Sequence, residues 1–319
     1  MHPWNQPVLD SLKLRTERLP HALLIHGAQG VGKLALAEKI AQLLLCEATD
    51  ASRKPCGSCE GCRWFTGGNH PDFRRLEPEA LAQPPDAATE EEGEAPARRG
   101  KPSIEIKIDQ VRELADFLNI GSHRGRLRVA LVHPAEEMNA SAANALLKAL
   151  EEPPASAMFL LVSHRPSRLL PTIRSRCVAL PVAIPRKEVA LQWLSAQGMQ
   201  NAERWLAYAG GAPLRALDYA GKAALIEHML RSPAPVEDRD ELELLVEALQ
   251  KSALDRAFVA LGGEPKYRTG ASPAPRSRAR DWLAYARRLG QDRPLCRHPL
   301  NPKLFSAELI AGMPDDATS

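Results

Sequence analysis

Four closely spaced cysteines have the residue type and spacing of a metal site. Cys46, Cys56, Cys59 and Cys62 form the pattern C-x9-C-x2-C-x2-C. Thiolates at this spacing can close a tetrahedral zinc site, and four protein ligands leave no open position for catalysis. The alternatives are four buried free thiols or an iron–sulfur cluster. Because closely spaced cysteines are rarely inert in a reducing compartment, we expect a structural zinc ion.

Residues 27–34 have the composition of a phosphate-binding loop. Four of them occupy the places that the pattern requires, namely Gly27, Gly30, Gly32 and Lys33. Glycines let backbone N–H groups curl round phosphates, and the lysine reaches the terminal phosphates. The last position is normally Ser or Thr, whose hydroxyl holds Mg²⁺, but here it is Leu34. Two alternatives follow: a loop that binds ATP or ADP weakly, or one that keeps its shape for packing and binds nothing.

The elements around the loop are those that phosphate binding needs. The apolar run 22–25 predicts a strand before the loop, and residues 34–45 predict a helix after it. A helix that begins at the end of such a loop directs unpaired N–H groups towards an anion. The order of elements therefore agrees with the composition of the loop.

A strand–helix–strand unit is predicted further along the chain. Apolar runs at 129–132 and 158–162 are short and bounded by polar residues, which favours buried parallel strands. Residues 142–150 between them are rich in Ala and Leu, which favours a helix. Either Asn139 or Ser141 can cap this helix, and a Pro-Pro pair ends it because proline lacks the N–H that a helix needs.

The segment before this unit is more varied. Residues 77–100 are rich in Pro, Ala and Glu without an apolar period, so we expect a surface insert. Residues 104–108 alternate apolar and charged side chains, as a short half-buried strand does. We expect Asp109 to cap a helix that starts at Gln110. A basic cluster at 123–128 could contact DNA phosphate or could be a solvated loop.

The composition is that of an ordinary globular protein. The chain has 319 residues, of which 44% are hydrophobic and 25% charged. A net charge of +3 is too small to indicate a nucleic-acid binder by itself. No apolar run reaches the roughly 18 residues of a membrane span, and no export signal opens the chain. We therefore expect a cytoplasmic protein that does not contact membranes.

Three motifs resemble those of bacterial clamp-loader subunits, the AAA+ proteins that open sliding clamps for DNA polymerase. They are Ala-Ala-Asn-Ala-Leu-Leu-Lys at 142–148, Leu-Glu-Glu-Pro-Pro at 150–154 and Leu-Pro-Thr-Ile-Arg-Ser-Arg-Cys at 170–177. The resemblance implies an α/β P-loop NTPase-like domain, then a small helical lid and an all-α collar. The implied bounds are 1–182 for the first domain, 183–220 for the lid and 221–319 for the collar. The first domain includes a zinc module at 46–62 and the acidic insert at 77–100.

The chain departs from the motor subunits of this family at the end of the strand 129–132. Motor subunits carry Asp-Glu-Ala-Asp or a close variant there, whereas this chain has His133, Pro134, Ala135 and Glu136. Together with Leu34, these changes remove the groups that hold magnesium and polarise water. Phosphoryl transfer depends on positioning and charge stabilisation. We therefore expect a non-hydrolysing subunit of the DNA polymerase III holoenzyme, a DNA-directed DNA polymerase, without ATPase activity of its own.

Two arginines have roles that the resemblance implies. In the family, the second arginine of the motif Thr-Ile-Arg-Ser-Arg-Cys at 172–177, here Arg176, points into the ATP site of a neighbouring subunit, where it acts as a trans arginine finger. The alternative is an exposed arginine paired with an acid. Arg215 lies in a segment that resembles the one carrying a sensor arginine. It could contact a nucleotide if one binds, and otherwise it caps a helix or packs.

The resemblance also implies the partners. These are gamma/tau-type motor subunits and a delta-type subunit in a heteropentamer, with the sliding clamp and primed DNA reached through the complex. Two other functions stay open. The chain could be an ATP-hydrolysing motor subunit, against which the residues at 34, 133 and 134 argue. It could also be a zinc-dependent DNA-binding protein, although it lacks a strong basic face.

Overall fold

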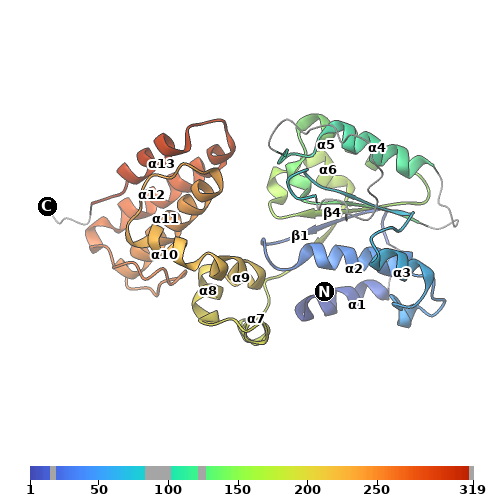
Figure 1. The fold of residues 1–319 in the computed structure, drawn as a ribbon, viewed down its shortest axis with the longest axis horizontal. Helices are drawn as coiled ribbons and strands as arrows, with labels where there is room; N and C mark the ends of the chain where they lie inside the picture. The colour runs from blue at the N-terminus through green and yellow to red at the C-terminus, as the bar shows by residue number, and fades with distance from the viewer. Residues whose placement is uncertain (15–18, 83–101, 121–126, 316–319) are drawn as a thin grey trace, which may run out of the picture. The chain divides into compact units, whose positions relative to one another are not determined.

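The chain divides into two compact units, Met1–Ile184 and Pro185–Ser319 (Figure 1). The computed structural model describes residues 1–14, 19–82, 102–120 and 127–315. Most of the acidic insert and most of the basic cluster at 123–128 lie outside these residues. The expected boundary between lid and collar, at residue 220, falls inside the second unit and stays a prediction.

A five-stranded parallel sheet forms the centre of the first unit, in the order β2-β3-β4-β1-β5. The strands are β1 (Ala22–His26), β2 (Phe73–Leu76), β3 (Arg128–Val132), β4 (Ala157–Ser163) and β5 (Val178–Pro181). Every residue of β3 and β4 is buried, as expected for parallel strands that are covered on both faces. Because the strands are parallel, their carboxyl ends meet at one edge of the sheet, where ligands bind in open α/β sheets.

Helices lie on both faces of this sheet. The α-helices of the first unit are α1 (Gln6–Lys13), α2 (Lys33–Leu45), α3 (Glu60–Thr66), α4 (Ile108–Asn119), α5 (Ala140–Glu151) and α6 (Pro171–Arg176), of which α1 and α3 pack on α2. Figure 1 shows α2 on one face and α4 and α5 on the other. The apolar faces of α4 and α5 pack on β3 and β4 in one core, which contains Leu114, Leu146 and Phe159. The α/β architecture expected from the sequence is confirmed.

The strand–helix–strand unit has the predicted elements, and the structure identifies the cap of its helix. The Asn139 side chain accepts a hydrogen bond from the Ala142 N–H at 2.8 Å. This bond satisfies one of the N–H groups that a helix leaves unpaired at its start. Asn139, not Ser141, is therefore the N-cap of α5.

The expected strand at 104–108 is wrong. Only Ile106 pairs with another segment, through an isolated bridge to Met138. Ile106 is fully buried whereas Ile104 is 51% exposed, so the alternating pattern contains a single core residue rather than a half-buried strand. The helix α4 begins two residues earlier than predicted, at Ile108, and the N-cap is Lys107 rather than Asp109.

The second unit is helical. Its α-helices are α7 (Lys187–Ala196), α8 (Ala202–Tyr208), α9 (Pro213–Gly221), α10 (Ala223–Arg231), α11 (Arg239–Ala260), α12 (Ala279–Asp292) and α13 (Pro302–Ala311). One apolar cluster is built from α7, α8 and α9, and another from α11 and α12. Among the helices that the structure describes, none is both long and apolar enough to cross a lipid bilayer.

Candidate functional site

The glycine-rich segment has the backbone geometry of a phosphate-binding loop. It connects β1 to α2, and Gly30 and Gly32 have φ angles of 83° and 79°, which favour glycine. A Cβ atom on Gly27 would lie 2.2 Å from the carbonyl oxygen of Val182. Glycine is therefore required at Gly27 by the close approach of a second segment, and at Gly32 by the backbone conformation at the start of α2.

Lys33 lies against the loop that precedes it. Its Nζ donates to the carbonyl oxygens of Gly27 at 2.9 Å and Ala28 at 2.5 Å. The residue is only 2% exposed, and burial lowers the pKa of its ammonium group to about 8, although the charge of Glu136 acts in the opposite direction. The lysine is thus held beside the place where the pattern puts a phosphate.

Side chains near the N-terminus hold the outer side of the loop. The Trp4 Nε1–H donates to the carbonyl oxygen of Val31 at 2.9 Å. The Asn5 Nδ2 donates to the same oxygen at 3.1 Å and to that of Gly32 at 3.2 Å. These bonds join two carbonyls of the loop to the N-terminal segment.

The end of β3 offers no oxygen ligand where motor subunits carry their first acid. His133 occupies this position, and its ring centroid lies 5.4 Å from that of His164. Burial, and secondarily His164, lower the pKa of His133 to about 4, so its imidazole is neutral at pH 7. Mg²⁺ prefers oxygen ligands, and neither His133 nor Leu34 supplies one.

Glu136, the acid that remains after β3, is used within the fold. Its Oε1 accepts the backbone N–H groups of His164 at 2.9 Å and Arg165 at 3.1 Å. The Arg165 N–H also contacts the Ser163 hydroxyl at 3.2 Å. Glu136 therefore ties the end of β3 to the turn after β4. The sequence indicated the position of this acid but not its partners.

The four cysteines of the predicted metal site come together. Their sulfur atoms all lie within 4.8 Å of one another, and the sulfurs of Cys46 and Cys59 are 3.9 Å apart. A tetrahedral zinc site with Zn–S bonds of about 2.3 Å separates its sulfurs by roughly 3.8 Å. Cys46 is the C-cap of α2, and Cys59 is the N-cap of α3. This four-sulfur group can hold a metal ion.

Backbone N–H groups already point at these sulfurs. The N–H of Cys56 donates to Cys46 Sγ, that of Cys59 to Cys56 Sγ and that of Cys62 to Cys59 Sγ, each at 3.3 Å. Such bonds favour the thiolate form that a metal requires. Those from Cys59 and Ser58 lower the pKa of Cys56 to about 5.

Arg176 ends α6 and is paired with an acid. Its Nη2 lies 2.6 Å from Oε1 of Glu151, at the end of α5. Its Nη1 donates to the carbonyl oxygen of Thr172 at 3.0 Å. The isolated chain therefore shows the pairing that the sequence offered as the alternative to a finger. The partner was not predicted, because Glu151 lies 25 residues earlier and reaches Arg176 only through the packing of α5 on α6.

Arg215 packs within the second unit. Its Nη2 lies 2.8 Å from Oε2 of Glu247 on α11 and 2.5 Å from the hydroxyl of Tyr219. Its guanidinium carbon also lies 4.6 Å from the centroid of the Tyr219 ring. Of the two roles offered by the sequence, packing describes these contacts, and nucleotide contact stays a prediction.

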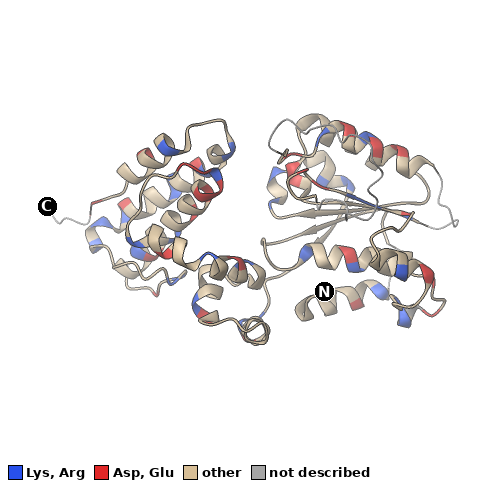
Figure 2. Ribbon diagram, in the orientation of Figure 1, with Lys and Arg blue, Asp and Glu red and all other residues tan. Residues whose placement is uncertain are grey.

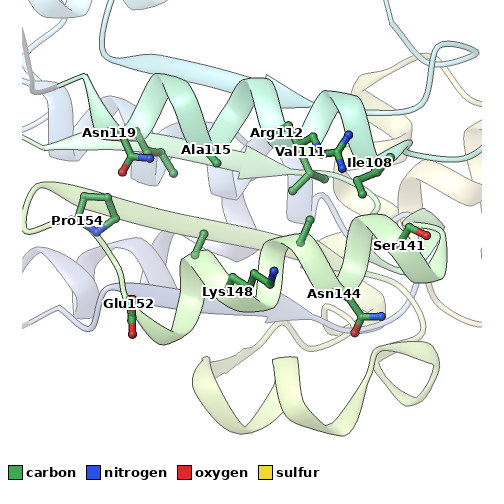
Figure 3. A pocket seen from close by; sticks show the side chains of 13 residues that line it. Ile108, Val111, Arg112, Ala115, Asn119, Ser141, Asn144, Lys148, Glu152 and Pro154 are labelled. Atoms are coloured by element: carbon green, nitrogen blue, oxygen red, sulfur yellow. The ribbon is translucent and has the colours of Figure 1, made fainter.

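A groove of about 710 Å³ lies between α4 and α5 (Figure 3). Its lining includes small side chains, Ala115 from α4 and Ala145 and Ala149 from α5, and polar residues such as Arg112 and Lys148. None of the predicted loop, cysteine or arginine residues lines this groove. The candidate chemistry is therefore located elsewhere, at the phosphate loop, the cysteine cluster and the end of α6.

Known proteins resemble this chain in sequence and in fold. The family model described as "DNA polymerase III, delta subunit" matches residues 7–185. DNA polymerase III subunit delta' of Pseudomonas aeruginosa is 41% identical over 220 residues, which cover 68% of this chain and 60% of the relative. The subunit of the same name from Yersinia pestis is 36% identical over 256 residues, or 79% of this chain and 68% of the relative.

A solved structure agrees with the fold alone. A DNA polymerase III gamma-subunit-related protein from Thermotoga maritima superposes with a TM-score of 0.51 at 18% identity, covering 95% of this chain and 97% of that protein. The match to the Pseudomonas aeruginosa subunit spans only 60% of its length. Since the family model covers more than half of the chain, and the match covers 68% of the Yersinia pestis subunit, the chain belongs to the family of DNA polymerase III delta-prime subunits.

Proposed function

We propose that this protein is a non-hydrolysing clamp-loader subunit that donates Arg176 as a trans arginine finger to a neighbouring motor subunit. One observation carries the proposal. A partly exposed arginine, the central residue of the Ser-Arg-Cys motif, ends α6 in a chain whose own phosphate loop is followed by Leu34. The arginine of the finger motif and the incomplete magnesium site occur in the same chain. We therefore infer that Arg176 serves the ATP site of another subunit.

The chemistry of phosphoryl transfer supports the first half of the proposal. The reaction needs a magnesium ion that bridges the phosphates and a group that positions water. Leu34 and Pro134 have no side-chain donor or acceptor for these tasks, and His133 is a neutral imidazole at pH 7. A nucleotide held near Lys33 would therefore remain uncleaved.

The position of Arg176 supports the second half. An arginine supplied by a neighbour stabilises the negative charge that builds on the transferring phosphoryl group. Its side chain is 35% exposed at the end of a short helix, so a phosphate on another subunit can reach it. The motors would be gamma/tau-type subunits, joined with a delta-type subunit in a heteropentamer that acts on the sliding clamp and primed DNA. The lid at 183–220 and the collar at 221–319 belong to the same proposal.

We further propose that the four-sulfur group holds zinc in a structural role. Four thiolates that can reach one ion favour zinc, and together they would fill all of its coordination positions. The ion would join the end of α2 to the loop and helix that follow it.

The proposal is tested by Arg176→Ala in the assembled clamp loader, with Arg174→Ala as the matched control. Arg174 is exposed on the same helix and makes no ion pair with a described residue. An arginine finger raises kcat about 10³-fold to 10⁵-fold at the site that it serves. We expect Arg176→Ala to abolish turnover at one neighbouring site, to lower total clamp- and DNA-stimulated ATPase in part, and to reduce clamp loading further. Wild-type ATPase in an intact Arg176→Ala complex would show that the protein is a scaffold only.

The loop geometry favours a second candidate, an ATP-hydrolysing motor subunit, because Lys33 and the glycines are in place. Magnesium-dependent hydrolysis by the isolated chain, lost in Lys33→Ala, would support that candidate. For a zinc-dependent DNA-binding protein we find no comparable observation. Basic and acidic residues are interspersed along the helices of both units that the structure describes (Figure 2), and a salt-dependent DNA titration would measure any such binding.

A further inference from the structure

The guanidinium of Arg176 is held in place by a carboxylate from a different helix. Glu151 is the last residue of α5 and Arg176 the last residue of α6. The 2.6 Å contact between Arg176 Nη2 and Glu151 Oε1 joins the two helix ends, and the bond from Nη1 to Thr172 fixes the other side of the guanidinium. Two anchors in different directions define the orientation of this planar group.

These anchors leave the arginine able to bind another anion. A guanidinium has five N–H donors in a fixed plane. The contacts to Glu151 and Thr172 use one donor each, and Nη1 also lies 3.5 Å from the Ser175 hydroxyl, so at least two donors remain. A long side chain that is fixed in advance loses less conformational freedom when it meets a phosphate. An arginine held on Glu151 is therefore closer to its working geometry than a freely rotating one.

The place of Glu151 is unfavourable for the helix that carries it. The C-terminal end of a helix bears partial negative charge, so an acid there is disfavoured. Glu151 ends α5 and Glu152 follows it. Of the two, Glu151 is paired with a cation, while Glu152 makes no ion pair with a described residue. The stability of α5 does not explain an acid at Glu151, whereas the arginine of the neighbouring helix does.

We propose that Glu151 is a positioning residue for the trans arginine finger. This inference rests on the proposed function of Arg176 and adds one residue to it. Glu151 touches no reacting group itself; it holds the guanidinium at the end of α6 so that the finger is oriented before the neighbour's phosphate arrives. Because both side chains are partly exposed, at 35% and 42%, the pair adds little to folding, and Glu151 can be replaced without unfolding the chain.

The test compares Glu151→Ala with Glu151→Gln in the assembled clamp loader, with Glu152→Ala as the matched control. We expect Glu151→Ala to lower kcat at the neighbouring site about threefold to tenfold, the order of effect of freeing one arginine side chain, with KM for ATP unchanged. Glu151→Gln should restore most of the rate, because its amide oxygen still accepts from Nη2. Glu152→Ala should match wild type.

The double variant Glu151→Ala/Arg176→Ala shows whether Glu151 acts through the arginine. We expect it to be no worse than Arg176→Ala alone, because no finger remains to be positioned. If Arg176→Ala lowers turnover but Glu151→Ala does not, the positioning role of Glu151 is wrong and the finger role of Arg176 stands. If Arg176→Ala has wild-type turnover, both roles are wrong. Faster turnover in Glu151→Ala would mean that the carboxylate restrains the finger, and an added loss in the double variant would mean that Glu151 acts elsewhere.

Discussion

Glu247 is the centre of a buried charge cluster in the second unit. Its carboxylate contacts Arg215 at 2.8 Å, Lys251 at 2.9 Å and Arg293 at 3.1 Å, and it accepts from the Tyr219 hydroxyl. Burial raises the pKa of this carboxyl group, but the three cations outweigh burial and lower it to about 2. One acid therefore joins α9, α11 and the segment after α12.

Glu247→Gln tests this arrangement through the pH dependence of stability. Removing one partner from a buried charge cluster typically costs about 3 kcal/mol or more, so we expect a loss of that order at pH 7. The folded pKa, about 2, lies below the ordinary value of 4.5. The stabilising contribution is therefore complete above pH 4.5 and is lost as the pH falls towards 2. Urea denaturation of the variant and of wild type should differ less at pH 3 than at pH 7.

Glu243→Gln is the control on the same helix. Glu243 is 36% exposed and pairs with Arg297 at 2.9 Å. Pairs of this kind contribute about 0–1 kcal/mol, so the change in unfolding free energy should be small at both pH values. A Glu247→Gln deficit of equal size at pH 7 and pH 3 would contradict the low pKa of Glu247.

At the scale of elements, the four-cysteine module is the part whose stability depends on a ligand. Metal binding can contribute about 10 kcal/mol to a small module. We expect purified protein to carry about one zinc ion per chain, and Cys59→Ser to lose the ion and increase hydrogen exchange at the end of α2 and in α3. Cys296→Ala, in the second unit, should keep its zinc. Metal-free protein from a preparation without chelator would refute the zinc assignment.

Runs of apolar residues in the sequence predicted the strands in which nearly every residue is buried. The apolar runs at 22–25, 129–132 and 158–162 became β1, β3 and β4, because a parallel strand that is covered on both faces needs apolar residues throughout. The alternation at 104–108 misled because only Ile106 reaches the core. A period of two identifies a strand only when a partner strand lies beside it, and a single sequence does not show that partner.

Motif spacing predicted the cysteine cluster and the phosphate loop, because the groups that would bind the ligand lie close together in the sequence. It did not predict Glu151 as the partner of Arg176, or Glu247 as the partner of Arg215. Each of these pairs joins two helices, 25 and 32 residues apart in sequence. The pairing depends on how the helices pack, which the order of residues alone does not specify.

At the scale of the whole molecule, the isolated chain should not turn over ATP. We expect no magnesium-dependent hydrolysis above background, and we expect Leu34→Thr to remain inactive. The new hydroxyl would supply one magnesium ligand. The end of β3 would still lack the acids that motor subunits carry there, because His133 and Pro134 occupy their positions. A phosphate-release assay on purified protein measures both. Appreciable activity in Leu34→Thr would show that the loop alone limits hydrolysis.

The hydrogen bond between Trp4 and Val31 gives the phosphate loop an optical reporter. Indole emission responds to the hydrogen bonding of its N–H, and the Trp4 indole donates directly to a carbonyl of the loop. Any ligand that shifts this carbonyl alters the surroundings of the chromophore. The chain has five tryptophans, so a variant that retains Trp4 and has Phe at the others isolates the signal. Occupancy of the loop then becomes readable by fluorescence, without labelling and without catalysis.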